Sequence, residues 1–166
     1  EDGIESLTSA PIYSLYGKQK KPTSEMLKGL DILVFDIQDI GIRYYTYLST
    51  LTYILEAASE NAIPVMVLDR LNPFGREIQG PILEIEFVSF VGMHPFPVRH
   101  GMTMGELAQM INGEGWLENG IYADLSIIPF TGEYDKKEIK NVFNPPPSPN
   151  ITDLETASFY QGLCLL

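Results

Sequence analysis

Three short apolar runs set the pattern of the chain, at 32–35, 64–68 and 125–128. Each run is too short for a helix of usual length and is rich in branched and aromatic side chains, which predicts strands, the first of them buried on both faces. Between the first two runs, apolar residues recur at helical spacing from Leu48 to Ala58, which predicts an amphipathic helix. A strand, a helix and a strand of this length indicate a right-handed crossover between parallel strands. We therefore expect an α/β fold, with a Rossmann-like, doubly wound and mainly parallel sheet that has helices on both faces.

Shorter elements complete the predicted outline. They are a strand at 12–15, a solvated turn at 18–21, a brief helix that starts at Thr23 and ends at Gly29, a charged surface segment at 135–140, and an extended proline-rich stretch at 145–149. Two further helices should begin at capping boxes, one formed by Thr103 and Glu106 and the other by Thr152 and Glu155.

Residues 73–101 form a long irregular excursion that contains many prolines and glycines. Long irregular insertions in a compact domain are usually functional or disordered. The apolar content of this one, which includes Ile82, Leu83 and Phe87, favours an ordered segment. We expect the insertion to pack over the site.

The acidic composition argues against several classes of partner. The chain has 166 residues, 45% of them apolar, and a formal net charge of −11, which suits one domain over residues 1–166 with a sizeable core. A strongly acidic chain is a poor ligand for nucleic acid or for an anionic membrane surface, and no run of 18 apolar residues is present for membrane insertion. The single cysteine, Cys164, excludes an internal disulfide and is expected to be a small buried apolar residue.

Polar side chains follow the first two predicted strands at the point where each strand ends. These residues are Asp36, Gln38, Asp39 and Arg43 after the first strand, and Asp69, Arg70 and Asn72 after the second. In an open parallel sheet the groups that carry out chemistry lie past the carboxyl ends of the strands, so two polar clusters there predict a pocket. The alternative is that the first cluster holds a buried pair of aspartate and arginine that ties the strand end to the next helix.

A third group of titratable residues lies within the insertion. Its members are Glu84, Glu86, His94, Arg99 and His100. By local sequence alone, Glu84 fits a solvated loop carboxylate better than a site residue, so its role depends on how the insertion folds.

The familiar catalytic signatures are missing from the sequence. It has no serine or cysteine elbow, no glycine-rich phosphate loop and no His/Cys spacing for zinc, so we expect no metal and no organic cofactor. The remaining carboxylates, amides and arginines suit a polyhydroxylated or anionic small substrate, with tyrosines such as Tyr45 packing on sugar faces. The order of Asp36 and Gln38 also raises the alternative of a haloacid-dehalogenase-like phosphatase, although the glutamine removes the usual second acid.

Five motifs, in order along nearly the whole chain, carry a resemblance to one family. They are LVFDIQDIGIRYYTY (33–47), VLDRLNP (67–73), GPILE (80–84), PVRHGMT (97–103) and PPSPN (146–150). Together they resemble a bacterial family first catalogued as a domain of unknown function, whose characterised members are exo-β-N-acetylmuramidases of the NamZ type. The resemblance implies a Rossmann-like N-terminal domain whose cleft is completed by a smaller C-terminal domain. It also implies release of terminal N-acetylmuramic acid from peptidoglycan fragments.

The resemblance implies that the first motif lines the cleft together with Glu84. The residues that we expect to bind substrate are Gln38, Arg43, Tyr45, Asp69, Arg70, Asn72, Arg99, His100, Ser148 and Asn150. For catalysis, we expect Glu84 to be a general acid that is desolvated as the insertion folds over the strand ends, and Asp36, Asp39 or a glutamate of an upstream family motif to be the partner carboxylate. The lactyl carboxylate of N-acetylmuramic acid should bind one of three arginines, Arg43, Arg70 or Arg99.

Family members carry two further motifs beyond the region that this chain matches, Glu-His-Gly-Phe-Arg-Gly upstream and Gly-Thr-Asn downstream. We therefore expect that a catalytic glutamate and the domain that completes the cleft lie outside this chain, and that the apolar end at 163–166 promotes association. A peptidoglycan substrate implies an extracytoplasmic location. The alternative function is a non-catalytic module that binds cell-wall sugars in the same cleft.

Overall fold

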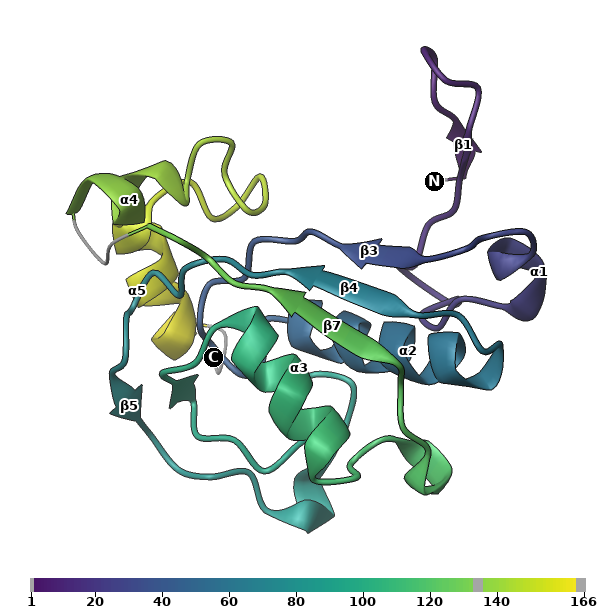
Figure 1. Cartoon of the computed structure of the whole chain (residues 1–166). Coiled ribbons are helices and arrows are strands. Elements are labelled where there is room, and N and C mark those ends of the chain that lie inside the picture. Colours follow the sequence, from purple (N-terminus) through teal and green to yellow (C-terminus); the bar gives the residue numbers. More distant parts are fainter. Residues whose placement is uncertain (1, 133–135, 164–166) are drawn as a thin grey trace.

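A parallel three-stranded sheet forms the centre of the computed structural model, which describes residues 2–132 and 136–163 (Figure 1). The strands are β3 (Leu33–Phe35), β4 (Val65–Leu68) and β7 (Leu125–Ile128), in the order β3-β4-β7. Phe35 lies opposite Val67, and Val67 lies opposite Ile127. The α/β class and the parallel sheet expected from the sequence are therefore confirmed.

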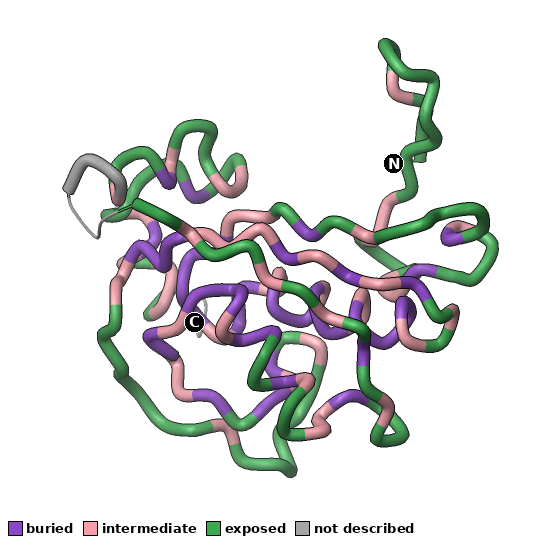
Figure 2. The backbone as a smooth tube through the Cα atoms, in the orientation of Figure 1, coloured by how far each residue is buried: buried purple, intermediate pink, exposed green. Residues whose placement is uncertain are grey.

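The core lies between this sheet and two long helices. These are α2 (Tyr47–Glu60) and α3 (Met104–Gly113). Their apolar stripes, which include Leu51 and Leu107, meet Phe35, Val65 and Val67 in one buried cluster, and Figure 2 shows the buried residues concentrated in this layer. The helical spacing seen from Leu48 onward thus marks the face of α2 that is removed from water, which is the main source of stability.

The opposite face of the sheet is more open than the apolar runs predicted. Val34 on β3 is 55% exposed, and Ile128 on β7 is 47% exposed. Val34 lies on a face that α2 and α3 do not cover, so the expectation that the β3 run is buried on both faces is wrong. A short apolar run predicts a strand but does not show whether both faces of its sheet are covered. In the described residues, α2 and α3 lie on the same face of the sheet.

Two predicted helix starts are confirmed. At α1 (Ser24–Leu27), the Thr23 hydroxyl accepts a hydrogen bond from the Met26 N–H. At α3, Thr103 and Glu106 form the predicted capping box, in which each side chain accepts a bond from the backbone of the other.

Two short predicted elements, a strand and a helix cap, differ from the structure. The strand expected at 12–15 is limited to β2 (Pro11–Ile12), which pairs with β1 (Gly3–Ile4) in a hairpin that projects from the rest of the molecule (Figure 1). The helix α5 (Leu154–Leu163) is capped by Asp153, whose Oδ1 accepts a bond from the Thr156 N–H at 2.7 Å, and not by the box expected at Thr152. Asp153 competes successfully because its carboxylate accepts backbone bonds more strongly than a hydroxyl does.

The segment expected to be a charged surface stretch at 135–140 forms the helix α4 (Lys136–Asn141). Together with α5, this helix lies beyond the carboxyl ends of the strands (Figure 1). Cys164 and the end of the apolar segment at 163–166, from residue 164 on, lie outside the described residues, so their predicted roles stay predictions.

The insertion at 73–101 is ordered, but it packs beside α2 and not over the strand ends. Its regular elements are β5 (Ile78–Gln79), the 3-10 turn η1 (Ile85–Phe87) and β6 (Arg99–His100), and β5 pairs antiparallel with β6. Ser49 of α2 donates a hydrogen bond to the Phe90 carbonyl at 2.5 Å, and Phe96 joins the main core. The expectation that the insertion covers the site is therefore wrong, because its apolar residues pack along the helix.

We predict that His94 makes the fold sensitive to acid. Its buried imidazole stacks on Trp116 with ring centroids 5.5 Å apart, and its Nε2 lies 2.9 Å from Thr52 Oγ1. Burial lowers the pKa of His94 from 6.5 to about 4. Below pH 6.5 the His94 imidazole is protonated in the unfolded chain but stays neutral in the folded chain. The free energy of unfolding is therefore unaffected by this group above pH 6.5 and falls as the pH decreases toward 4.

Urea unfolding at pH 7 and pH 4.5 measures this effect. The free energy of unfolding should fall by about 2 to 3 kcal/mol more in the wild type than in His94→Gln, which keeps a donor for Thr52 but does not titrate. Equal losses in the two proteins would contradict the prediction.

Candidate functional site

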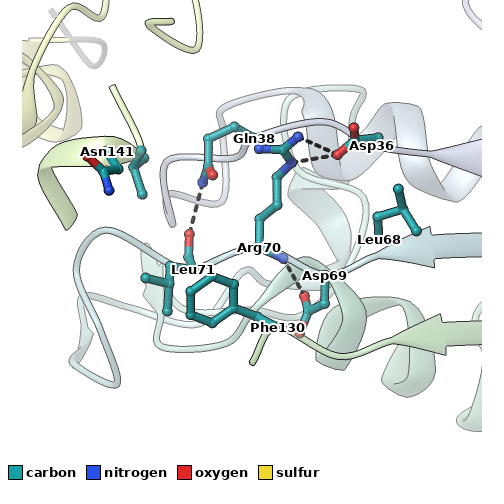
Figure 3. A pocket seen from close by; sticks show the side chains of 9 residues that line it. Asp36, Gln38, Leu68, Asp69, Arg70, Leu71, Phe130 and Asn141 are labelled. Atoms are coloured by element: carbon teal, nitrogen blue, oxygen red, sulfur yellow. Dashed lines mark hydrogen bonds and ion pairs between the residues drawn. The ribbon is translucent and has the colours of Figure 1, made fainter. Parts of the chain in front are cut away.

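Side chains from the ends of β3, β4 and β7 meet around a cavity of about 350 Å³ (Figure 3). The residues that line it are Asp36, Gln38, Leu68, Asp69, Arg70, Leu71, Phe130, Asn141 and Val142. The structure therefore brings together the two polar clusters that the strand-end rule predicted. Phe130 and Asn141 were not predicted from the sequence. Phe130 follows β7 by two residues, so the same rule applied to the third strand would have indicated it, whereas no local signal marks Asn141.

An ion pair between Asp36 and Arg70 joins the carboxyl ends of β3 and β4. Arg70 Nε and Nη2 lie 2.6 and 2.5 Å from the same carboxylate oxygen, Asp36 Oδ1. Both side chains remain in contact with water, since Arg70 is 42% and Asp36 is 45% exposed. A solvated pair of this kind contributes little to stability, so its guanidinium is able to bind an anionic ligand at small cost.

Asp69, next to Arg70 in the sequence, connects β4 to α3 through its carboxylate. Its Oδ2 accepts a bond from Thr103 Oγ1 at 2.8 Å, and its Oδ1 accepts bonds from the N–H groups of Gly105 and Arg70 at 2.7 and 3.0 Å. The carboxylate thus ties the end of β4 to the first turn of α3, where the helix dipole also favours a negative charge. Asp69 lines the cavity, but its oxygens are committed to these donors.

Gln38 and Asn72 hold neighbouring loops in place. Gln38 Nε2 donates to the carbonyls of Asp39 and Leu71 at 2.7 and 2.9 Å. Asn72 Nδ2 donates to the Met102 carbonyl at 3.0 Å, and its Oδ1 accepts from the Phe74 N–H. Gln38 lines the cavity, whereas Asn72 is buried away from it.

Asp39 and His100 are both buried and lie close to each other, outside the cavity. Asp39 Oδ2 accepts a bond from the Gly41 N–H at 2.6 Å and lies 3.8 Å from His100 Nε2. His100 Nδ1 accepts from the Met102 N–H at 3.3 Å. Neither residue lines the strand-end cavity, so their predicted catalytic and binding roles stay predictions that would require access to a buried pair.

Two of the three candidate arginines bind other parts of the protein. Arg43 Nη1 donates to the carbonyls of Pro81 and Phe96 at 2.8 and 2.5 Å, which anchors the insertion. Arg99 pairs with Glu77 and donates to Gln161 Oε1 at 2.8 Å. Among the three, Arg70 is the one that lines the strand-end cavity.

Glu84 is exposed at the start of η1 and lines none of the cavities described. The expectation that the insertion desolvates it against Asp36 or Asp39 is wrong, because the insertion turns along α2. Its assignment as the general acid stays a prediction.

The remaining predicted residues lie around a neighbouring pocket. Tyr45, Ser148 and Asn150 line a cavity of about 420 Å³. A smaller cavity of about 260 Å³ shares Asp36 and Arg70 with the strand-end cavity and Tyr47 with the neighbouring pocket. Seven of the predicted site residues thus line one of these two pockets, namely Asp36, Gln38, Tyr45, Asp69, Arg70, Ser148 and Asn150, and the others line neither.

Comparison with known proteins identifies the family. Residues 1–155 match the family model described as "Exo-beta-N-acetylmuramidase NamZ, N-terminal". The chain belongs to the NamZ family. The resemblance found in the sequence motifs is therefore confirmed, and the phosphatase alternative is not supported.

One relative of the NamZ family is the peptidoglycan beta-N-acetylmuramidase NamZ of Bacillus subtilis (strain 168), which is 49% identical over 166 residues. That match covers 98% of this chain and 39% of the relative. Two crystal structures of DUF1343 family proteins from Bacteroides fragilis NCTC 9343 are also similar. One has a TM-score of 0.86 at 44% identity and covers 95% of this chain and 41% of its own. The other has a TM-score of 0.85 at 39% identity and covers 98% and 44%. The chain therefore spans about two fifths of the length of these NamZ relatives.

Residues 2–132 and 136–163 contain no candidate metal site and no candidate membrane helix. No group of three or more His, Cys, Asp or Glu side chains there is arranged to hold a metal ion. No helix in the same ranges is long and apolar enough to cross a membrane.

The hydrogen bonds between Asp69 and α3 predict that substitution of two glycines of this helix by alanine has opposite effects on the free energy of unfolding. A Cβ at Gly105 would lie 2.8 Å from Asp69 Cγ and 2.8 Å from Ile127 Cγ2, whereas a Cβ at Gly113 would meet nothing within 4 Å. Gly105→Ala should lower the free energy of unfolding by about 1 to 3 kcal/mol. Gly113→Ala, the matched control, should raise it by up to about 1 kcal/mol, because alanine is the better helix former. Denaturant titration measures both changes, and a stabilising Gly105→Ala would contradict the assigned packing.

Proposed function

We propose that this chain supplies the saccharide-binding part of a glycosidase that releases terminal N-acetylmuramic acid from peptidoglycan fragments. The observation that carries the proposal is the solvated pair of Arg70 and Asp36 at the strand-end cavity. It lies in a chain that is 49% identical to a peptidoglycan beta-N-acetylmuramidase.

The chemistry of the cavity suits an anionic amino sugar. A protein of net charge −11 repels anions at long range, so a lactyl carboxylate needs a local cation. The guanidinium of Arg70 matches a carboxylate in two-point geometry. Asp36 and the Gln38 amide then lie within the same cavity as acceptors for sugar hydroxyl groups. The volume of about 350 Å³ is within the range of small-molecule sites.

For the reaction, we assign Asp36 as a carboxylate that faces the sugar. Glycoside hydrolysis usually requires a second carboxyl group that acts as the acid. Among residues 2–132 and 136–163, the other carboxylate at this cavity is Asp69, which is bonded to Thr103 and Gly105, so we do not assign it this role. Because peptidoglycan lies outside the cytoplasm, the proposal also includes an extracytoplasmic location.

A non-catalytic sugar-binding module is the second candidate. The observation that favours it is that Glu84, the predicted acid, is exposed and away from the cavity. Incubation of this chain, joined to the remaining part of a NamZ relative, with a chromogenic N-acetylmuramide separates the two functions, since an enzyme releases the chromophore and a module binds the compound intact.

Replacement of Arg70 by lysine tests the proposed function. Arg70→Lys keeps the charge but loses the two-point contact, so affinity for N-acetylmuramic acid should fall about tenfold or more while affinity for N-acetylglucosamine changes little. Isothermal titration with the two sugars measures the ratio. Arg76→Lys is the matched control, because Arg76 pairs with Glu106 on the surface and does not line the cavity. A wild-type ratio in Arg70→Lys would refute the assignment of this arginine.

A further inference from the structure

The chain contains two Asn-Gly sequences, Asn112-Gly113 and Asn119-Gly120. An asparagine that precedes glycine is able to lose its side-chain amide without an enzyme, because the glycine has no Cβ to hinder the approach of its backbone nitrogen to the asparagine Cγ. The reaction requires a side-chain amide that is not held elsewhere and a backbone that rotates locally. The two asparagines differ in both respects.

The side chain of Asn112 is held at both of its polar atoms. Its Nδ2 donates to the Ala123 carbonyl at 3.0 Å, and its Oδ1 accepts from the Ala123 N–H at 2.8 Å. Asn112 and Gly113 also end α3, which packs on the main core through Leu107 and Ile111. Attack on the Asn112 Cγ therefore requires that two side-chain bonds break and that the end of a packed helix opens.

Asn119 lies in an exposed turn, η2 (Glu118–Gly120). Within residues 2–132 and 136–163, its side chain has no hydrogen-bond partner. Its backbone has φ 59° and ψ 16°, a left-handed conformation that asparagine adopts more readily than most residues. The Gly120 N–H donates to the Leu117 carbonyl at 3.2 Å, which is at the long end of the normal range.

The space around the second glycine is also open. A Cβ at Gly120 would meet nothing within 4 Å, so the turn can change its backbone angles without a clash. Local opening of an exposed turn with few packed neighbours costs little free energy. The backbone nitrogen of Gly120 therefore reaches the Asn119 Cγ more often than the nitrogen of Gly113 reaches the Asn112 Cγ.

We propose that Asn119 is a site of spontaneous deamidation and that the fold protects Asn112 from the same reaction. The backbone nitrogen of Gly120 forms a bond to the Asn119 Cγ and loses its proton to water. The bond between Cγ and Nδ2 then breaks, and the side-chain nitrogen takes up a proton and leaves as ammonia. Water adds to one of the two carbonyl carbons of the resulting succinimide and opens the ring, which gives aspartate or isoaspartate.

The products change the surroundings of a buried carboxylate. The Glu118 N–H donates to Glu56 Oε1 at 3.0 Å, and the Glu56 side chain is 3% exposed and pairs with Lys21 at 3.1 Å. Deamidation adds a negative charge next to Glu118 in a chain whose net charge is already −11, and isoaspartate also lengthens the backbone of the turn by one carbon. We expect both changes to weaken the bond to Glu56.

Incubation of the whole 166-residue chain in mildly alkaline buffer, followed by anion exchange and peptide mapping by mass spectrometry, tests the site. In the folded chain, Asn119 should convert at least about tenfold faster than Asn112, because the exposed turn opens more easily than the packed helix. In the chain unfolded by urea, the two asparagines should convert at similar rates, since each precedes a glycine. This arm is the matched control for the effect of the fold.

The variant Asn119→Gly separates this site from the other amides of the chain. Glycine suits the positive φ and has no amide to lose, so the folded variant should lack the first acidic product that the wild type forms. The purified wild-type product should unfold at a lower urea concentration than the unconverted chain, because the bond to Glu56 is weakened.

Four results would overturn the inference. They are conversion of Asn112 as fast as that of Asn119 in the folded chain, no product at Asn119 while the unfolded chain converts, the same first acidic product in Asn119→Gly, and equal urea midpoints of the product and the unconverted chain. None of these results affects the Arg70 test of the proposed function, because neither asparagine lines the strand-end cavity.

Discussion

The bonds of the Asp69 carboxylate are the constraint on which the strand-end site depends. Asp69 directly follows β4. Its carboxylate accepts hydrogen bonds from Thr103 and Gly105 at the first turn of α3, so it fixes the helix to the sheet at one point. Successive side chains at a strand end point in different directions. With Asp69 directed toward α3, the next side chain, Arg70, extends toward Asp36 of the neighbouring strand (Figure 3). The position of the guanidinium at the cavity thus follows from a structural bond one residue away.

The fold places a cavity lined by charged side chains close to a pocket whose lining is uncharged. Arg70 supplies a cation at the carboxyl ends of the strands, where an acidic chain needs one to attract an anion. On the other side of Tyr47 and Pro147, aromatic rings and hydroxyl groups line a pocket without charge.

The sequence predicted the elements whose signal is local. The sheet strands, α2 and the Thr103 capping box follow from apolar spacing and cap chemistry, and the strand-end rule correctly brought Asp36 and Arg70 together. Orientation was not predictable, because it depends on distant backbone groups. Arg43 turns toward the carbonyls of Pro81 and Phe96, and Glu84 is exposed because the insertion packs along α2. The alternative of a buried aspartate–arginine pair within the first cluster is wrong, because Arg43 binds backbone carbonyls and Asp36 pairs instead with Arg70, in a solvated pair that joins two strands.

A crystal structure of the chain with bound N-acetylmuramic acid is the most direct test of the role assigned to Arg70. The lactyl carboxylate should lie about 3 Å from the guanidinium nitrogens of Arg70, with Asp69 still bonded to Thr103 and Gly105. A sugar bound with its carboxylate at Arg43 or Arg99, or away from the strand ends altogether, would contradict this role.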